Sequence, residues 1–78
     1  MLQRLTKAEA RAAYNAGTPI LLASHRKTRQ QIESNPSHHA HSICQREYPL
    51  ATFNDRVDDY KALQPHGDTL THYWVAAN

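Results

Sequence analysis

The first third of the chain has the apolar pattern of a helix followed by a buried strand. Thr6 and Glu9 have the spacing of a capping box, which predicts that a helix begins at Thr6. Alanines of high helix propensity follow, and Gly17 is suited to end the helix in a left-handed conformation. Residues 20–23 then form a short unbroken apolar run, which is typical of a strand buried on both faces. The residues expected on the buried side of the helix are Leu5, Ala10, Ala13 and Tyr14.

Residues 25–41 lose this pattern and are predicted to form a polar, basic and histidine-rich loop. Ile32 is the one large aliphatic side chain in the segment, which therefore has little to bury. Residues 28–34 have room for one exposed helical turn. A loop of this length is uncommon in a compact domain unless it is functional or disordered.

The second half of the chain predicts a strand, a helix and a final strand. Residues 42–48 have the pattern of a weak strand. A helix is expected to start at Thr52, because the side chains of Thr52 and Asp55 suit the unbonded amides of a first helical turn. Residues 64–68 have turn chemistry, and residues 69–77 are rich in β-branched and aromatic side chains, as in a strand. The apolar stripe of this second helix consists of Phe53, Val57, Tyr60 and Leu63.

These elements predict a small α+β domain over residues 1–78. The expected order is helix, strand, loop, strand, helix, strand, with a sheet of two or three strands packed against two helices. A domain of this length buries only about 60–65% of the surface that its unfolded chain exposes, so we expect one core of modest stability.

The cysteine content and apolar runs of the chain indicate its cellular compartment, and its charge distribution indicates the ligands that it attracts. The lone Cys44 cannot form an internal disulfide, which favours a reducing compartment. No apolar run approaches a signal peptide or the roughly 20 residues of a membrane span, so we expect a cytoplasmic protein with no membrane partner. Residues 1–46 carry seven Lys/Arg against two Glu, whereas residues 47–78 carry two Lys/Arg against five Asp/Glu. The basic half attracts anions and the acidic half attracts cations if the charged side chains of each half cluster in space.

Several short segments of the chain follow a pattern known from other sequences. They are residues 5–10 (LTKAEA), Tyr14, Gly17, residues 20–22, the helix of residues 53–60 and residues 72–75 (HYWV). Together they resemble small bacteriophage and prophage accessory proteins over about half of the chain. The histidine-rich segment departs from that group. The resemblance implies an accessory protein of viral or mobile-element type, with no assigned catalytic residues.

A basic run at residues 25–31 has the composition of a segment that contacts phosphate. Arg26, Lys27 and Arg29 can donate hydrogen bonds to the backbone oxygens of a nucleic acid. The run lacks an adjoining aromatic platform for bases, and the acidic second half would repel DNA from much of the surface. Nucleic-acid binding through these three residues is therefore the alternative to binding a protein.

Acidic and aromatic side chains of the second half are also candidates for partner contacts. Asp55 and Asp59 share a helix face, and Asp58 lies within the same turn, so the three form either a solvated face or a docking surface for basic residues. Tyr73 and Trp74 alternate along the last strand, and one interpretation places one of them in the core and leaves the other partly exposed, where aromatic residues are typical of binding hot spots. Core packing of both is the other possibility.

His38, His39, His41 and Cys44 form the densest group of possible metal ligands. Imidazole and thiolate suit Zn²⁺, but the paired short spacings of a structural zinc site are missing, and adjacent histidines point in divergent directions. A zinc-binding module is therefore the second alternative, and we expect no metal and no cofactor. Nothing in the sequence supplies an oxyanion hole or a third catalytic group for Cys44, so we expect no enzyme.

The leading hypothesis is a non-enzymatic binding protein of phage or mobile-element type. Its expected partner is a host protein or nucleoprotein complex, and an anti-CRISPR-like inhibitor of host defence is the concrete form of this hypothesis. The small size, the resemblance and the lack of a recognisable catalytic motif support it.

Overall fold

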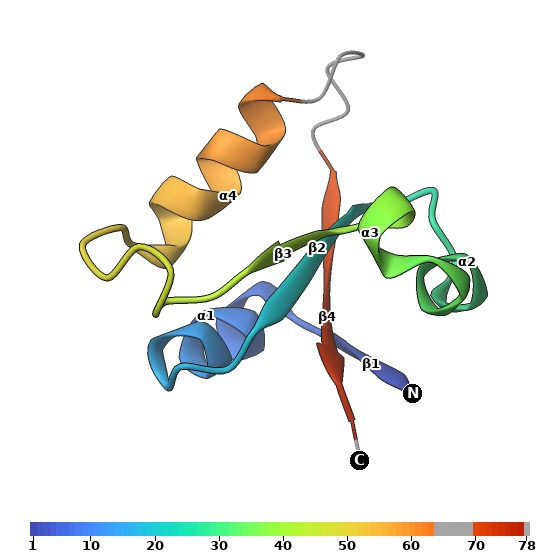
Figure 1. Cartoon of the computed structure of the whole chain (residues 1–78), viewed down its shortest axis with the longest axis horizontal. Coiled ribbons are helices and arrows are strands. Elements are labelled where there is room, and N and C mark those ends of the chain that lie inside the picture. The colour runs from blue at the N-terminus through green and yellow to red at the C-terminus, as the bar shows by residue number, and fades with distance from the viewer. Residues whose placement is uncertain (64–69, 78) are drawn as a thin grey trace.

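A four-stranded antiparallel sheet forms the centre of the computed structural model, which describes residues 1–63 and 70–77. The strands lie in the order β1-β4-β2-β3, and their bounds are β1 (Leu2–Leu5), β2 (Ile20–Ser24), β3 (His41–Ile43) and β4 (Thr71–Ala76). The helices are α1 (Lys7–Asn15), α2 (Arg29–Ser34), α3 (Pro36–His39) and α4 (Phe53–Ala62). This arrangement confirms the predicted α+β class (Figure 1).

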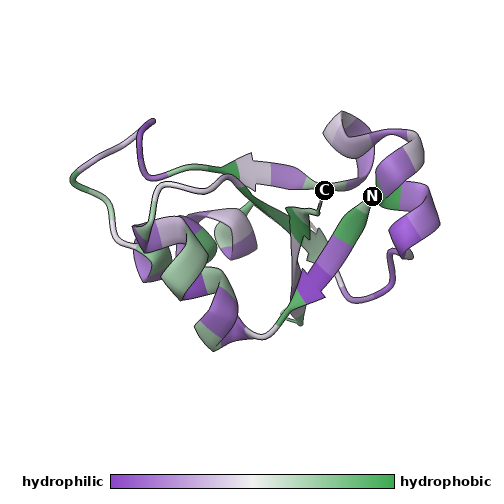
Figure 2. Ribbon diagram, turned by 90° about the horizontal axis from the view of Figure 1, so that it is seen from below, coloured by the Kyte–Doolittle hydropathy of each residue, from purple (hydrophilic) through white to green (hydrophobic). Residues whose placement is uncertain are grey.

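Helices cover both faces of the sheet. On one face, Tyr14 of α1 and Phe53 of α4 pack with Tyr73 of β4 in the larger apolar core. On the other face, Ile32 of α2 packs with Trp74, the next residue of β4. Figure 2 shows the sheet, with its most hydrophobic segments, between these two layers, and polar residues dominate α2 and α3. The interior strand β4 is thus covered by helices on both faces of the sheet.

The second covered face corrects two predictions. Residues 25–41 are not one loop, because they contain α2 and α3, and Thr28 and Gln31 form a capping box at the start of α2. The interpretation that leaves one of the two aromatic residues of β4 partly exposed is also wrong, and the alternative, core packing of both, is confirmed. Tyr73 and Trp74 are 7% and 5% exposed, because one faces α1 and α4 while the other faces α2.

The two predicted helix starts are confirmed. Thr6 and Glu9 exchange both capping-box hydrogen bonds at α1, and Thr52 and Asp55 do the same at α4. Gly17 follows α1 with a φ of 90°, a left-handed conformation that strains residues with a Cβ atom. The two capping boxes and Gly17 therefore have the roles that the sequence predicts for them.

The sheet departs from the prediction at its edges. The edge strand β1 was not predicted, because its pattern Leu-Gln-Arg-Leu does not alternate. Only the first part of the predicted strand at 42–48 is extended, since Glu47 donates its amide to the Cys44 carbonyl in a turn. Leu63 is 73% exposed and does not continue the buried stripe of α4. The predicted turn at 64–68 and the first residue of the predicted last strand lie outside the described residues.

Thr28→Ala is expected to lower the free energy of unfolding by about 1 kcal/mol, because it removes the side-chain cap of α2. The matched control is Ser37→Ala, since the exposed Ser37 hydroxyl donates to the Asn35 side chain and caps no helix. Urea titration followed by Trp74 fluorescence measures both changes. An unchanged midpoint for Thr28→Ala would contradict the prediction that this cap stabilises the fold.

Candidate partner-binding surface

The loop between β3 and α4, residues 44–52, carries large apolar side chains into solvent. Leu50 is 99% exposed and Tyr48 is 60% exposed. The loop extends beyond the end of β3 and returns to the start of α4 (Figure 1). Exposed apolar side chains gathered in one place are typical of surfaces that bind another macromolecule.

This loop is held in a defined shape at its base and at its tip. The Ala51 amide donates to the Tyr48 carbonyl at 3.0 Å, which closes a turn at the tip. The hydroxyl of Tyr14, a buried residue of α1, donates to the Ala51 carbonyl at 3.1 Å. At the other end the Cys44 thiol donates to the Gly17 carbonyl at 3.6 Å. The apolar tip is therefore presented by an ordered backbone, which reduces the entropy lost on binding.

Arg56 of α4 lies beside this tip and is only 8% exposed. Its guanidinium carbon lies 4.6 Å from the centre of the Tyr48 ring, in cation–π geometry. Its Nη1 atom is buried, and no described residue accepts a hydrogen bond from it. A buried charged donor without an acceptor is unfavourable. The described residues therefore do not explain why this charged side chain is buried.

A hollow of about 330 Å³ opens next to Arg56, and we call it the arginine hollow. Asp59 of α4 lies in its wall, so the hollow combines a cation, an anion and aromatic surface. The described residues that line it are His41, Tyr48, Ala51, Arg56, Asp59, Tyr60 and Leu63.

The acidic residues predicted to bind a partner separate into two roles. Asp59 lines the arginine hollow and Asp58 is exposed on α4. Asp55 accepts from the Thr52 amide at 3.0 Å as part of the capping box. Asp55 therefore has a structural role in starting α4, and Asp59 is the acidic residue best placed for a partner contact.

The predicted basic residues have different surroundings. Arg26 and Arg29 are exposed, and the Arg29 guanidinium lies 5.9 Å from the Trp74 ring centre. Lys27 is half-buried and lines a second hollow, of about 270 Å³, together with His38 and His39. We call this the histidine hollow.

The histidine hollow lowers the basicity of His39. Burial, and then the nearby charges of Lys27 and His38, hold the pKa of His39 below its ordinary value. The same pattern occurs at His72, whose pKa is lowered by burial and by Arg4 and His25. Each of these two histidines therefore has cationic neighbours.

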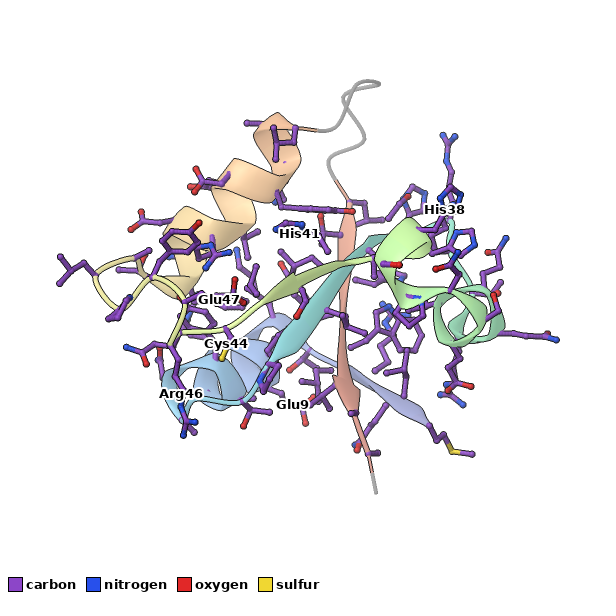
Figure 3. The ribbon with its side chains drawn as sticks, in the orientation of Figure 1. Glu9, His38, His41, Cys44, Arg46 and Glu47 are labelled. Carbon is purple, nitrogen blue, oxygen red and sulfur yellow. The ribbon has the colours of Figure 1, made fainter. Side chains whose placement is uncertain are left out.

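The structure separates Cys44 from the histidines proposed as zinc ligands with it, although His38, His39 and His41 line one hollow. Cys44 lies beside α1, well away from His38 on α3 (Figure 3). In the described ranges 1–63 and 70–77, no group of three or more His, Cys, Asp or Glu side chains is placed to hold a metal ion. Within the same ranges no helix has the length and apolar character needed to cross a membrane.

Sequence reasoning missed Tyr48, Leu50 and Arg56. Tyr48 and Leu50 flank Pro49, and two large apolar residues beside a proline that ends the predicted strand are the signal that could have found them. Arg56 follows Phe53 by three residues and so falls on the buried face of α4. A charged residue on an apolar stripe was the available clue.

Comparison with known proteins gives no relative. No protein-family model, no curated protein and no solved structure matches the chain. The case for a function therefore rests on the surfaces described above.

Proposed function

We propose that this chain is a small non-enzymatic binding protein that docks on a protein partner through the loop of residues 44–52 and the adjoining side of α4. The observation that carries the proposal is the nearly complete exposure of Leu50 on an ordered loop, beside Tyr48. Most other large apolar side chains of the sheet and helices are placed in the two cores.

The chemistry of this surface favours a protein partner. Tyrosine and arginine are enriched among the residues that dominate protein interfaces, and Tyr48 and Arg56 lie in contact here. The arginine hollow offers Arg56 to a carboxylate and Asp59 to a donor, with apolar surface around both. The fitting partner segment carries an apolar side chain next to a carboxylate.

The partner class follows from the leading sequence hypothesis. We propose a host protein or nucleoprotein complex as the target, with inhibition of a CRISPR defence complex as the concrete case. The small size of the chain and the resemblance of residues 5–22 to phage proteins support this choice. An effect on defence is measured as the plating efficiency of a targeted phage on hosts that express the chain.

A photo-crosslinking residue at position 50 is expected to join the chain to one protein partner in host cells. The same residue at Gln30, an exposed position of α2, is the matched control and should not give that product. Mass spectrometry of the crosslinked species identifies the partner. Equal products from both positions, or none from position 50, would reject this surface.

With the partner purified, Tyr48→Ala is expected to weaken binding by about 30-fold, as for a residue at the centre of an interface. Leu70→Ala removes an apolar side chain that is 56% exposed at the start of β4 and should leave the Kd unchanged. Calorimetric titration measures both. Equal effects of the two substitutions would show that exposed apolar area in general, and not this surface, is responsible.

A further inference from the structure

We propose that the histidine hollow is a binding site for a phosphate group. Lys27 lines it from the segment between β2 and α2, His38 and His39 line it from α3, and His41 lines it from β3. Ammonium and protonated imidazole groups are donors that form charge-assisted hydrogen bonds to phosphate oxygens. Such a group of donors around one concave site is a recognition feature for an oxyanion.

The lining of the hollow also favours anions over cations. Among its described lining residues there is no carboxylate, so none of these residues neutralises Lys27. The arginine hollow differs, because Asp59 lines it. The two hollows share His41, Tyr60 and Leu63, so the phosphate site lies next to the proposed protein-docking surface.

His39 supplies the second observation. Its Nδ1 atom is buried, and no described residue forms a hydrogen bond with it. Burial and the charges of Lys27 and His38 also lower the pKa of His39, so its charged form is unfavourable without a ligand. A bound anion reverses the second condition, because it compensates the nearby cations and so favours the charged imidazole.

The volume of the hollow indicates how much of a ligand it encloses. At about 270 Å³ it is slightly below the usual range for sites that enclose a whole small molecule, which is roughly 300–1,000 Å³. The hollow therefore suits a phosphate and the first atoms of its carrier. The carrier is a nucleotide, the phosphorylated end of a nucleic-acid strand, or none.

The test is titration of the full chain with inorganic phosphate, with AMP and with a 5′-phosphorylated single-stranded RNA, followed by the NMR signals of the histidine rings. Saturable shifts of His38 and His39 are expected with at least one probe. The probe with the lowest Kd identifies the carrier. Lys27→Gln is expected to weaken that probe by about tenfold or more, because one charge-assisted bond is lost.

Lys7→Gln is the matched control, since Lys7 is exposed at the start of α1 and does not line the hollow. It should leave the Kd unchanged. Binding by none of the three probes would overturn the proposal, and so would binding that survives Lys27→Gln. The docking surface is tested separately by Tyr48→Ala, so failure of one proposal leaves the other standing.

The pH dependence of sulfate binding provides a second measurement. Sulfate keeps its charge over the range from about pH 5.5 to 8, whereas histidine side chains titrate there. The imidazoles of His38, His39 and His41 face the hollow together with Lys27 and Tyr60. Since an anion favours the charged imidazole, binding takes up protons, and the affinity for sulfate is expected to rise as pH falls. An affinity that is independent of pH would exclude the histidines from the site.

Discussion

Phe53→Ala is expected to lower the free energy of unfolding by about 3–5 kcal/mol. Phe53 is 2% exposed and joins three elements of the larger core. Its ring centre lies 5.8 Å from that of Tyr14 on α1 and 5.7 Å from that of Tyr73 on β4. Truncation removes both aromatic contacts and leaves a cavity where α1, α4 and the sheet meet.

A loss of this size is serious for a domain of 78 residues, whose total stability is about 4–12 kcal/mol by the usual value per residue. Urea titration measures the change. Leu63→Ala is the matched control, because Leu63 follows α4 and is 73% exposed, so its truncation should cost less than about 0.5 kcal/mol. Similar midpoints for the two variants would show that Phe53 does not join the helices to the sheet.

Local chemistry made part of this fold predictable. The capping boxes at Thr6 and Thr52 and the left-handed Gly17 depend on neighbouring residues, so the sequence displays them directly. Thr28 and Gln31 display the same signature at α2. That signature alone does not predict a packed helix, because the segment around it is polar and its single buried anchor, Ile32, meets Trp74 only in the folded chain.

The candidate sites were harder to predict, because they too depend on contacts that form only in the folded chain. Lys27 and His39 are far enough apart in the chain that their shared hollow depends on how α3 follows α2. The exposure of Tyr73 or Trp74 depended on whether a second layer covers the sheet, and pattern alone does not reveal that layer. Arg56 was visible as a charge on an apolar stripe, but the lack of an acceptor for it among the described residues is a property of the packed structure.

Arg56→Met is expected to separate binding from stability. Methionine has a similar length, needs no hydrogen-bond acceptor, and keeps a favourable sulfur contact with the Tyr48 ring. Because the substitution removes a buried donor without a described acceptor, the free energy of unfolding should stay the same or rise by up to about 2 kcal/mol. Binding to the partner should weaken by about 30-fold or more, since a partner carboxylate would lose its buried cation.

The control for this prediction is Arg46→Met, which replaces an exposed arginine of the same loop and should change neither stability nor binding appreciably. Urea titration and calorimetric titration with the purified partner measure the two quantities. If Arg56 has only a structural role, its replacement will lower the unfolding free energy and leave the Kd unchanged, because the cation–π contact with Tyr48 would then be its whole contribution. A variant that is more stable and binds less tightly has the opposite signature. That result is expected of a buried cation whose acceptor is supplied by a partner.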